Sequence, residues 1–171
     1  MITIYTDGSS RGNPGPGGWA AIIDDGETLK EIGGREDHTT NNRMELTAAI
    51  RSLEFAINNF SSKGGPANPG GGQFSRIQIN TDSEYLMKGI TLWIKNWQLK
   101  GWKTAGRKPV LNQDLWQALL AQTEGKSVEW QYVAGHSGHD ANERCDEIAT
   151  MFADSLKPDL YHGSRNSYSH F

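Results

Sequence analysis

Two aspartates in this chain each follow a short run in which apolar and polar residues alternate. Asp7 comes directly after MITIYT (1–6), and Asp82 comes directly after RIQINT (76–81). Alternation with a period of two is typical of a half-buried β-strand. Open α/β sheets bind their ligands beyond the carboxyl ends of the strands, so both aspartates are expected where a ligand binds.

If the two runs form neighbouring parallel strands, Asp7 and Asp82 meet at one edge of the sheet. Two carboxylates placed side by side repel each other unless a cation neutralises them. Carboxylate oxygens are the ligands that Mg²⁺ takes in proteins. A lone aspartate before glycine is usually a turn residue, so it is the repetition of the pattern that predicts a divalent-metal site.

Other catalytic sites find less support in the sequence. His136, His139 and Cys145 suggest zinc, but no fourth ligand stands at the spacing of a zinc finger. The glycine-rich segment 8–18 lacks the G-x-G-x-x-G spacing of a dinucleotide site. The sequence also lacks a complete G-x-x-x-x-G-K-[ST] motif, because the G-K-S at 125–127 has Leu120 at the position of the first glycine. No serine lies in a nucleophile-elbow motif, which argues against a serine hydrolase.

Elements that can bring the two aspartates together are predicted by the remaining pattern. Two further strands are expected near 19–23 and 28–34, joined by a turn at Asp25-Gly26. Apolar residues at spacings of four, three, four and three follow from Leu46 to Phe60 and predict an amphipathic helix, with Glu45 in its first turn. As a crossover, this helix makes the strand before Asp82 parallel to the first strand.

The rest of the chain extends this α/β arrangement. Short helices are expected at about 83–90 and after Asn112, which we predict to be an N-cap. The run 127–133 alternates as a fifth strand, and a last helix is expected to begin at Asp140. The sequence thus predicts a five-stranded mixed sheet with flanking helices. Strands 1–3 form an antiparallel meander, and strands 1, 4 and 5 are parallel.

Length and composition predict one domain in a reducing compartment. The chain has 171 residues, a net charge of −3 and a single cysteine. It shows neither a secretory signal nor an apolar run long enough to span a membrane, so we expect a cytoplasmic monomer with no membrane contact. We expect the domain at 1–156, with a flexible glycine-rich loop at 61–73 inside it and a disordered tail at 157–171.

A basic, tryptophan-rich stretch stands out against the negative net charge. No acidic residue occurs between Glu84 and Asp114. The stretch contains the basic residues Lys88, Lys95, Lys100, Lys103, Arg107 and Lys108, and the tryptophans Trp93, Trp97 and Trp102. A local patch of this kind is what an acidic protein needs in order to bind nucleic acid.

Five longer segments together resemble one family. They are TDGSSRGNPGPGGWA, TTNNRMEL, NTDSEYL, WIKNWQLKGWKT and VAGHSGHDANERCDEIA. In this order and at these spacings they are similar to the motifs of bacterial type 1 ribonucleases H, which cut the RNA strand of RNA–DNA hybrids. The resemblance extends from Met1 to about Asp154 and implies a ribonuclease H-like fold.

This resemblance implies an endoribonuclease that uses metal ions. It places the four metal-binding carboxylates of the family at Asp7, Glu45, Asp82 and Asp146, and the catalytic histidine at His136. Two Mg²⁺ ions in the substrate complex, or Mn²⁺ in their place, then activate a water and stabilise the leaving oxygen. By position alone, Glu45 and Asp146 fit ordinary acids on helix surfaces as well as they fit metal ligands.

Contacts to the hybrid are implied on both sides of the acids. Recognition of a hybrid requires contacts to 2′-hydroxyls on one strand and to phosphates on the other. The implied substrate-binding residues are Ser10, Asn13, Thr40, Asn41, Asn42, Glu84, Trp93, Lys95, Trp97, Lys100 and Lys103. Of these, Glu84 departs from the family, since many relatives have glutamine there.

Two other functions remain open at this point. A hybrid-binding module without catalysis would keep the fold, although the presence of all four acids argues against it. A related nuclease that uses the same acids on DNA is the second, and the asparagines and the basic stretch argue against that reading. Cleavage of labelled hybrid and of duplex DNA, with and without Mg²⁺, separates the three.

Overall fold

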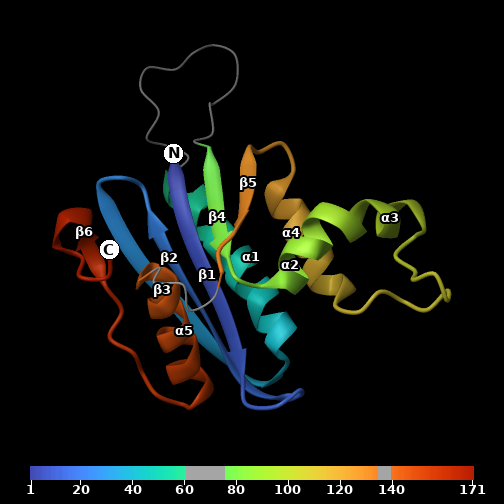
Figure 1. Ribbon diagram of the computed structural model, residues 1–171, viewed down its shortest axis with the longest axis horizontal. Coiled ribbons are helices and arrows are strands. Elements are labelled where there is room, and N and C mark those ends of the chain that lie inside the picture. The colour runs from blue at the N-terminus through green and yellow to red at the C-terminus, as the bar shows by residue number, and fades with distance from the viewer. Residues whose placement is uncertain (61–75, 135–139) are drawn as a thin grey trace, which may run out of the picture.

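The structure is a computed structural model that describes residues 1–60, 76–134 and 140–171 (Figure 1). Its described residues form a six-stranded sheet of order β5-β4-β1-β2-β3-β6. The strands are β1 (Ile2–Ser10), β2 (Gly15–Asp24), β3 (Thr28–Thr39), β4 (Ile77–Thr81), β5 (Val128–Tyr132) and β6 (His162–Ser164). The antiparallel meander β1-β2-β3 and the parallel set β1, β4 and β5 confirm the predicted topology, with one strand more than predicted.

Helices connect and cover these strands. They are α1 (Asn41–Phe60), α2 (Glu84–Lys88), the π-helical turn η1 (Gly89–Trp93), α3 (Ile94–Leu99), α4 (Gln113–Thr123), α5 (Asp140–Ala153) and the 3-10 turn η2 (Arg165–Ser167). No helix in the described ranges has both the length and the apolar character to cross a membrane. The glycine-rich segment predicted at 61–73 and both loop histidines fall outside these ranges.

One apolar core lies on each face of the sheet, and successive side chains of β2 point alternately into the two cores. Ala21 and Ile23 belong to the larger core, which also contains residues of β1, β4, α1 and α4. Ala20 and Ile22 belong to the second core, under α5. Helices α1 and α5 therefore lie on opposite faces of the central strands (Figure 1). Each helix can direct a side chain toward the point where the pairing of β1 with β4 ends.

Residues 157–171, which we call the C-terminal segment, were expected to be disordered, and that expectation is wrong. The segment adds β6 antiparallel to β3, with Leu29 opposite Gly163. Arg165 pairs with Asp24 at 2.7 Å, and Tyr168 is buried in the second core. Aromatic rings and one arginine dock the segment, although its sequence has no periodic apolar pattern.

Three local predictions also differ from the structure. Strand β1 continues through Asp7 to Ser10, because its pairing with β2 extends to the Ser10–Gly17 pair. Helix α1 begins at Asn41, so Glu45 lies one turn further into the helix than expected. Asn112 precedes α4 with a φ of 58° and makes no capping bond; its side chain instead donates to the Tyr85 hydroxyl at 3.1 Å.

Candidate active site

The parallel pairing of β1 with β4 brings the two aspartates together. The paired register ends with Thr6 opposite Thr81, and the next residue on each strand is Asp7 or Asp82. Asp7 is buried, and its Oδ1 accepts a hydrogen bond from the backbone N–H of Gly8 at 2.7 Å. Asp82 follows the last residue of β4, immediately before Ser83, the N-cap of α2. The predicted meeting of the two carboxylates is therefore observed.

Glu45 reaches the same point from the other side, because α1 approaches β1 very closely. A Cβ atom on Gly8 would lie 2.3 Å from the backbone nitrogen of Glu45 and 2.4 Å from the carbonyl carbon of Met44. Only glycine allows this approach. The closeness of the helix to the strand places the Glu45 side chain beside Asp7.

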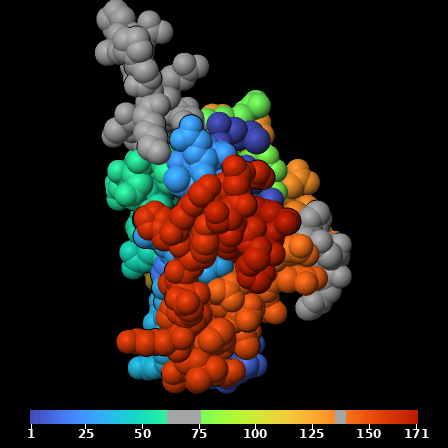
Figure 2. All heavy atoms as spheres, turned by 90° about the vertical axis from the view of Figure 1, so that its left-hand side faces the viewer, coloured from blue at the N-terminus to red at the C-terminus, as the bar shows by residue number. Residues whose placement is uncertain are grey.

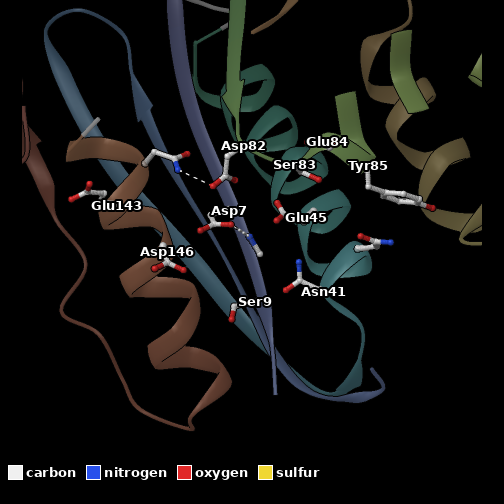
Figure 3. Close-up of a pocket in the computed structure, with 13 residues that line it drawn as sticks. Asp7, Ser9, Asn41, Glu45, Asp82, Ser83, Glu84, Tyr85, Glu143 and Asp146 are labelled. Atoms are coloured by element: carbon white, nitrogen blue, oxygen red, sulfur yellow. Dashed lines mark hydrogen bonds between the residues drawn. The ribbon is translucent and has the colours of Figure 1, made fainter. Parts of the chain in front are cut away.

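Asp7, Glu45 and Asp82 form a compact group of carboxylates (Figure 3). One oxygen of each lies within 4.8 Å of the others. Oε2 of Glu45 is buried without a hydrogen-bond partner. A buried carboxylate oxygen without a partner is costly, and a divalent cation bound by the three oxygens would remove that cost. The donor set, which consists of oxygen atoms only, fits Mg²⁺.

Burial and mutual repulsion make these acids hard to ionise without a cation. Burial raises the pKa of Asp7, and the negative charges of Asp82 and Asp146 add to the effect, so that this pKa reaches about 8. Burial and then the charge of Asp7 raise the pKa of Glu45 well above its ordinary value. Both shifts have the direction expected where carboxylates are crowded together to bind a cation.

Helix α5 contributes two further residues to this edge. Asp146 lies outside the compact group but lines the same pocket, and it is exposed. One turn earlier, the side-chain amide of Asn142 donates to Oδ2 of Asp82 at 3.2 Å. Asn142 is buried, and its own Oδ1 has no partner. Asn142 was not among the predicted site residues, because nothing in the local pattern distinguishes it from an ordinary helix residue.

These residues surround an open pocket of about 370 Å³. Its lining consists of Asp7, Gly8, Ser9, Asn41, Asn42, Glu45, Asp82, Ser83, Glu84, Tyr85, Asn142, Glu143 and Asp146. Among the predicted substrate-binding residues, Asn41, Asn42 and Glu84 are therefore at the site. Glu84 is paired with Lys88 at 2.6 Å, and this hydrogen-bonded partner lowers the pKa of Glu84.

Ser10, Asn13 and Thr40 lie beside the pocket and shape its border. Ser10 Oγ donates to Oδ1 of Asn13 at 3.2 Å, and the same oxygen accepts from the backbone N–H of Asn41 at 3.0 Å. Thr40 Oγ1 accepts from the backbone N–H of Arg43 at 3.3 Å and so caps α1. These bonds connect the turn after β1 to the first residues of α1.

The predicted basic protrusion consists of η1, α3 and the connection to α4, and it extends away from the sheet (Figure 1). Trp93 and Trp97 are half-buried in a series of aromatic contacts, with Trp93 5.9 Å from Tyr85 and Trp97 5.5 Å from Trp116. Tyr85, which also lines the pocket, thus links the protrusion to the acids. The protrusion lysines Lys95, Lys100 and Lys103 are all exposed.

A carboxylate cluster at the edge of a mixed sheet, with asparagines and a basic protrusion beside it, defines a metal-dependent nuclease. The RNase H family profile matches residues 1–154, and the chain belongs to this family. It is 52% identical to a ribonuclease H of Cyanothece sp. over 158 residues, 92% of each chain. It is 49% identical to a ribonuclease H of Nitrobacter hamburgensis over 86% of this chain and 88% of the relative.

Solved structures agree with this assignment. LC9-RNase H1, a type 1 RNase H with the type 2 active-site motif, is 30% identical with a TM-score of 0.73; the match covers 95% of this chain and 77% of that one. LC11-RNase H1 in complex with RNA/DNA hybrid is 25% identical with a TM-score of 0.64, over 91% of this chain and 98% of that one. The predicted family and fold class are confirmed.

Proposed function

We propose that this chain is an endoribonuclease that hydrolyses the RNA strand of RNA–DNA hybrids at the pocket described above. The observation that carries the proposal is the convergence of Asp7, Glu45 and Asp82, from β1, α1 and the end of β4, within 4.8 Å. Membership in the RNase H family and the hybrid bound to LC11-RNase H1 support the substrate.

The residues present fit two Mg²⁺ ions, with Mn²⁺ able to take the same oxygen ligands. We assign the ligands to Asp7, Glu45, Asp82 and Asp146. Cations held by these residues would supply activation of the attacking water and stabilisation of the leaving oxygen of a phosphodiester. Asp146 is exposed at the mouth of the pocket, which suits a ligand that completes the set when substrate arrives.

The side chains themselves orient the ligands and handle protons. Asn142 donates to Asp82 and so fixes the direction of that carboxylate, as outer hydrogen-bond partners of metal ligands do. Asp7, with its raised pKa, must release a proton on binding a cation. We assign to His136 either proton transfer between the site and solvent or assistance to product departure, because imidazole is the side chain that most readily gains or loses a proton near neutral pH.

Two surfaces are proposed to recognise the hybrid. Asn41 and Asn42 line the pocket, and their amides can both donate to and accept from 2′-hydroxyls. Ser10, Asn13, Thr40 and Glu84 complete this surface. On the protrusion, Lys95, Lys100 and Lys103 are proposed to contact phosphates of the DNA strand, while Trp93 and Trp97 pack against its sugars.

Cleavage of a hybrid labelled on the RNA strand tests the proposal. We expect cleavage with Mg²⁺ and none with chelator, and no cleavage of duplex DNA of the same sequence. Binding of the hybrid without cleavage would identify an inactive binding module, and cleavage of duplex DNA would identify a DNA nuclease. A monomeric state and a cytoplasmic location are also proposed, and light scattering and cell fractionation measure them.

A further inference from the structure

A buried carboxylate joins helix α5 to the C-terminal segment. Glu31 on β3 is 2% exposed, and its oxygens accept from Nε of Arg144 at 2.8 Å and from Nη2 at 3.1 Å. The same carboxylate accepts from the backbone N–H of Tyr161 at 2.8 Å and from the Tyr168 hydroxyl at 2.7 Å. Arg144 also donates to the carbonyl of Asp159 at 2.9 Å. The sheet, α5 and the C-terminal segment therefore meet at one ion pair.

Arg144 lies between the two residues that α5 presents to the metal site. Asn142, which donates to Asp82, precedes it by two positions, and Asp146 follows it by two positions. Since the helix rises about 1.5 Å per residue, each is only about 3 Å from Arg144 along the axis. A rotation or shift of α5 that moves Arg144 therefore moves both site residues.

Apolar packing sets which face of α5 meets the sheet, and a polar contact fixes the rotation more finely. Cys145, Ile148 and Ala149 of α5 pack in the second core, but burial of apolar surface has no preferred direction. A bidentate arginine–carboxylate pair does have one. Burial raises the pKa of Glu31, yet the hydrogen bonds from Arg144, Tyr161 and Tyr168 outweigh it and leave this pKa below its usual value. The pair is thus ionised at neutral pH.

The other end of α5 has separate anchors. Arg35 donates to the carbonyl of Phe152 at 3.0 Å, and Arg11 pairs with Asp154 at 2.6 Å. The Glu31–Arg144 pair is therefore the ion pair nearest to the metal site among those that hold α5 to the sheet in the described residues. Figure 2 shows the C-terminal residues, in dark red, spread over this face of the molecule beside the orange residues of α5.

We propose that Glu31 and Arg144, held by the C-terminal segment, are positioning residues of the metal centre. They hold α5 in the rotation that presents Asp146 and Asn142 to Asp7 and Asp82. They touch neither substrate nor cation and act through the helix. The proposal rests on the proposed function, because it takes Asp146 as a cation ligand. It extends the site to a segment outside the residues matched by the family profile.

The test compares two matched substitutions, Glu31→Gln and Asp24→Asn. Both acids are buried, and both pair with an arginine, but the Asp24–Arg165 pair ties the C-terminal segment to the sheet without touching α5. Mn²⁺ binding to the metal-free protein is measured by calorimetry, and kcat and KM for hybrid cleavage are measured in Mg²⁺. All measurements are made well below each variant's melting temperature.

We expect both variants to lower the melting temperature and only Glu31→Gln to weaken cation binding. Its Kd should rise about three- to tenfold, less than the ~10–100-fold typical of direct outer-shell partners, because the effect passes through the helix. Its kcat should fall while KM for the hybrid is unchanged. A Kd and kcat for Glu31→Gln equal to those of Asp24→Asn would overturn the proposal and leave the pair a purely structural role.

Two further variants keep the test decisive if Glu31→Gln does not fold. Tyr168→Phe removes only the hydroxyl that donates to Glu31, and Arg144→Lys keeps the charge but loses the bidentate geometry. We expect each to weaken Mn²⁺ binding by a smaller factor, and unchanged binding in both would overturn the proposal. If the wild type itself neither binds Mn²⁺ nor cleaves hybrid, the proposed function fails; a normal wild type beside unaffected variants refutes only the positioning role.

Discussion

At the scale of single residues, the site contains carboxyl groups that are hard to ionise unless a cation binds beside them. Asp7 and Glu45 are buried, and the pKa of each is raised by burial and by neighbouring negative charge. The fold has therefore placed groups together that are stable only when protonated or bound to a cation. An arrangement of this kind destabilises the protein locally and is expected at functional sites rather than in structural ones.

Asp82→Asn should fold normally and lose essentially all hybrid cleavage. The amide keeps the size of the side chain and removes one repulsive charge from Asp7, so the melting temperature without metal should be unchanged or higher. The variant loses the negative charge that a cation requires. Cleavage in Mg²⁺ and the melting temperature are measured together. Wild-type turnover in a folded variant would remove Asp82 from the site.

At the scale of elements, the site exists because α1 can touch β1. The Gly8 position leaves no room for a side chain, and the two backbones are in direct contact there. Nearby, the hydrogen bond from the Asn41 N–H to Asn13 holds the turn after β1 close to the start of α1. A small change at this contact is therefore expected to displace Glu45 and the asparagines together.

Gly8→Ala should lower the free energy of unfolding by about 2 kcal/mol or more and sharply reduce cleavage. The added methyl group would overlap backbone atoms of Met44 and Glu45, and overpacking typically costs about 1–3 kcal/mol. Denaturant unfolding and hybrid cleavage measure the two effects. Gly106→Ala is the control, because the nearest atom to its new Cβ is 3.9 Å away. Equal behaviour of the two variants would contradict the steric argument.

The protrusion should contribute affinity rather than chemistry. Replacing Lys95, Lys100 and Lys103 by alanine should weaken hybrid binding and leave turnover at saturation nearly unchanged, because these lysines lie outside the pocket lining. For every phosphate that is no longer bound, the slope of log affinity against log salt should flatten by roughly 0.7 to 0.9. Binding is measured in Ca²⁺ at several salt concentrations. Lys157→Ala on the C-terminal segment is the control, and an unchanged slope in the triple variant would exclude the protrusion from the substrate path.

At the scale of the whole molecule, site and stability are linked through protons and cations. Without metal, the free energy of unfolding should fall as the pH rises from about 4 to about 8. The pKa of Asp7 is about 8 in the folded protein and near 3.9 when unfolded. Between these values the folded state keeps a proton that the unfolded state has released, so stability decreases with rising pH. Denaturant unfolding in chelator at several pH values measures the decrease.

Asp7→Asn and Mg²⁺ should each reduce this pH dependence. The amide does not titrate, so only the contribution of Glu45 is left in the variant. Mg²⁺ binds the folded state alone and restores stability most at high pH, where the carboxylates release their protons readily. If Asp7→Asn unfolds with the same pH dependence as the wild type, the raised pKa of Asp7 is not its cause.

Local patterns in the sequence were sufficient to predict the strands and the helix whose formation depends on neighbouring residues. Alternation before Asp7 and Asp82 predicted two strands, and the spacing from Leu46 to Phe60 predicted the crossover helix that makes those strands parallel. The period of the apolar residues shows which side of a strand or helix is buried, and this period can be read from residues that are close together in the sequence. The meeting of Asp7 with Asp82 followed from the topology.

Tertiary structure alone decided the contacts between distant segments. Tyr168 and Glu31 are 137 positions apart, and Asn142 and Asp82 are 60 apart. Neither pair leaves a trace in a local pattern. The C-terminal segment is ordered because a few aromatic and arginine side chains find buried acids on the sheet, and hydrogen bonds to a buried charge are strong enough to dock a segment with no apolar period. Such partners are known only when the sheet is assembled, since the sheet itself determines which acids are buried.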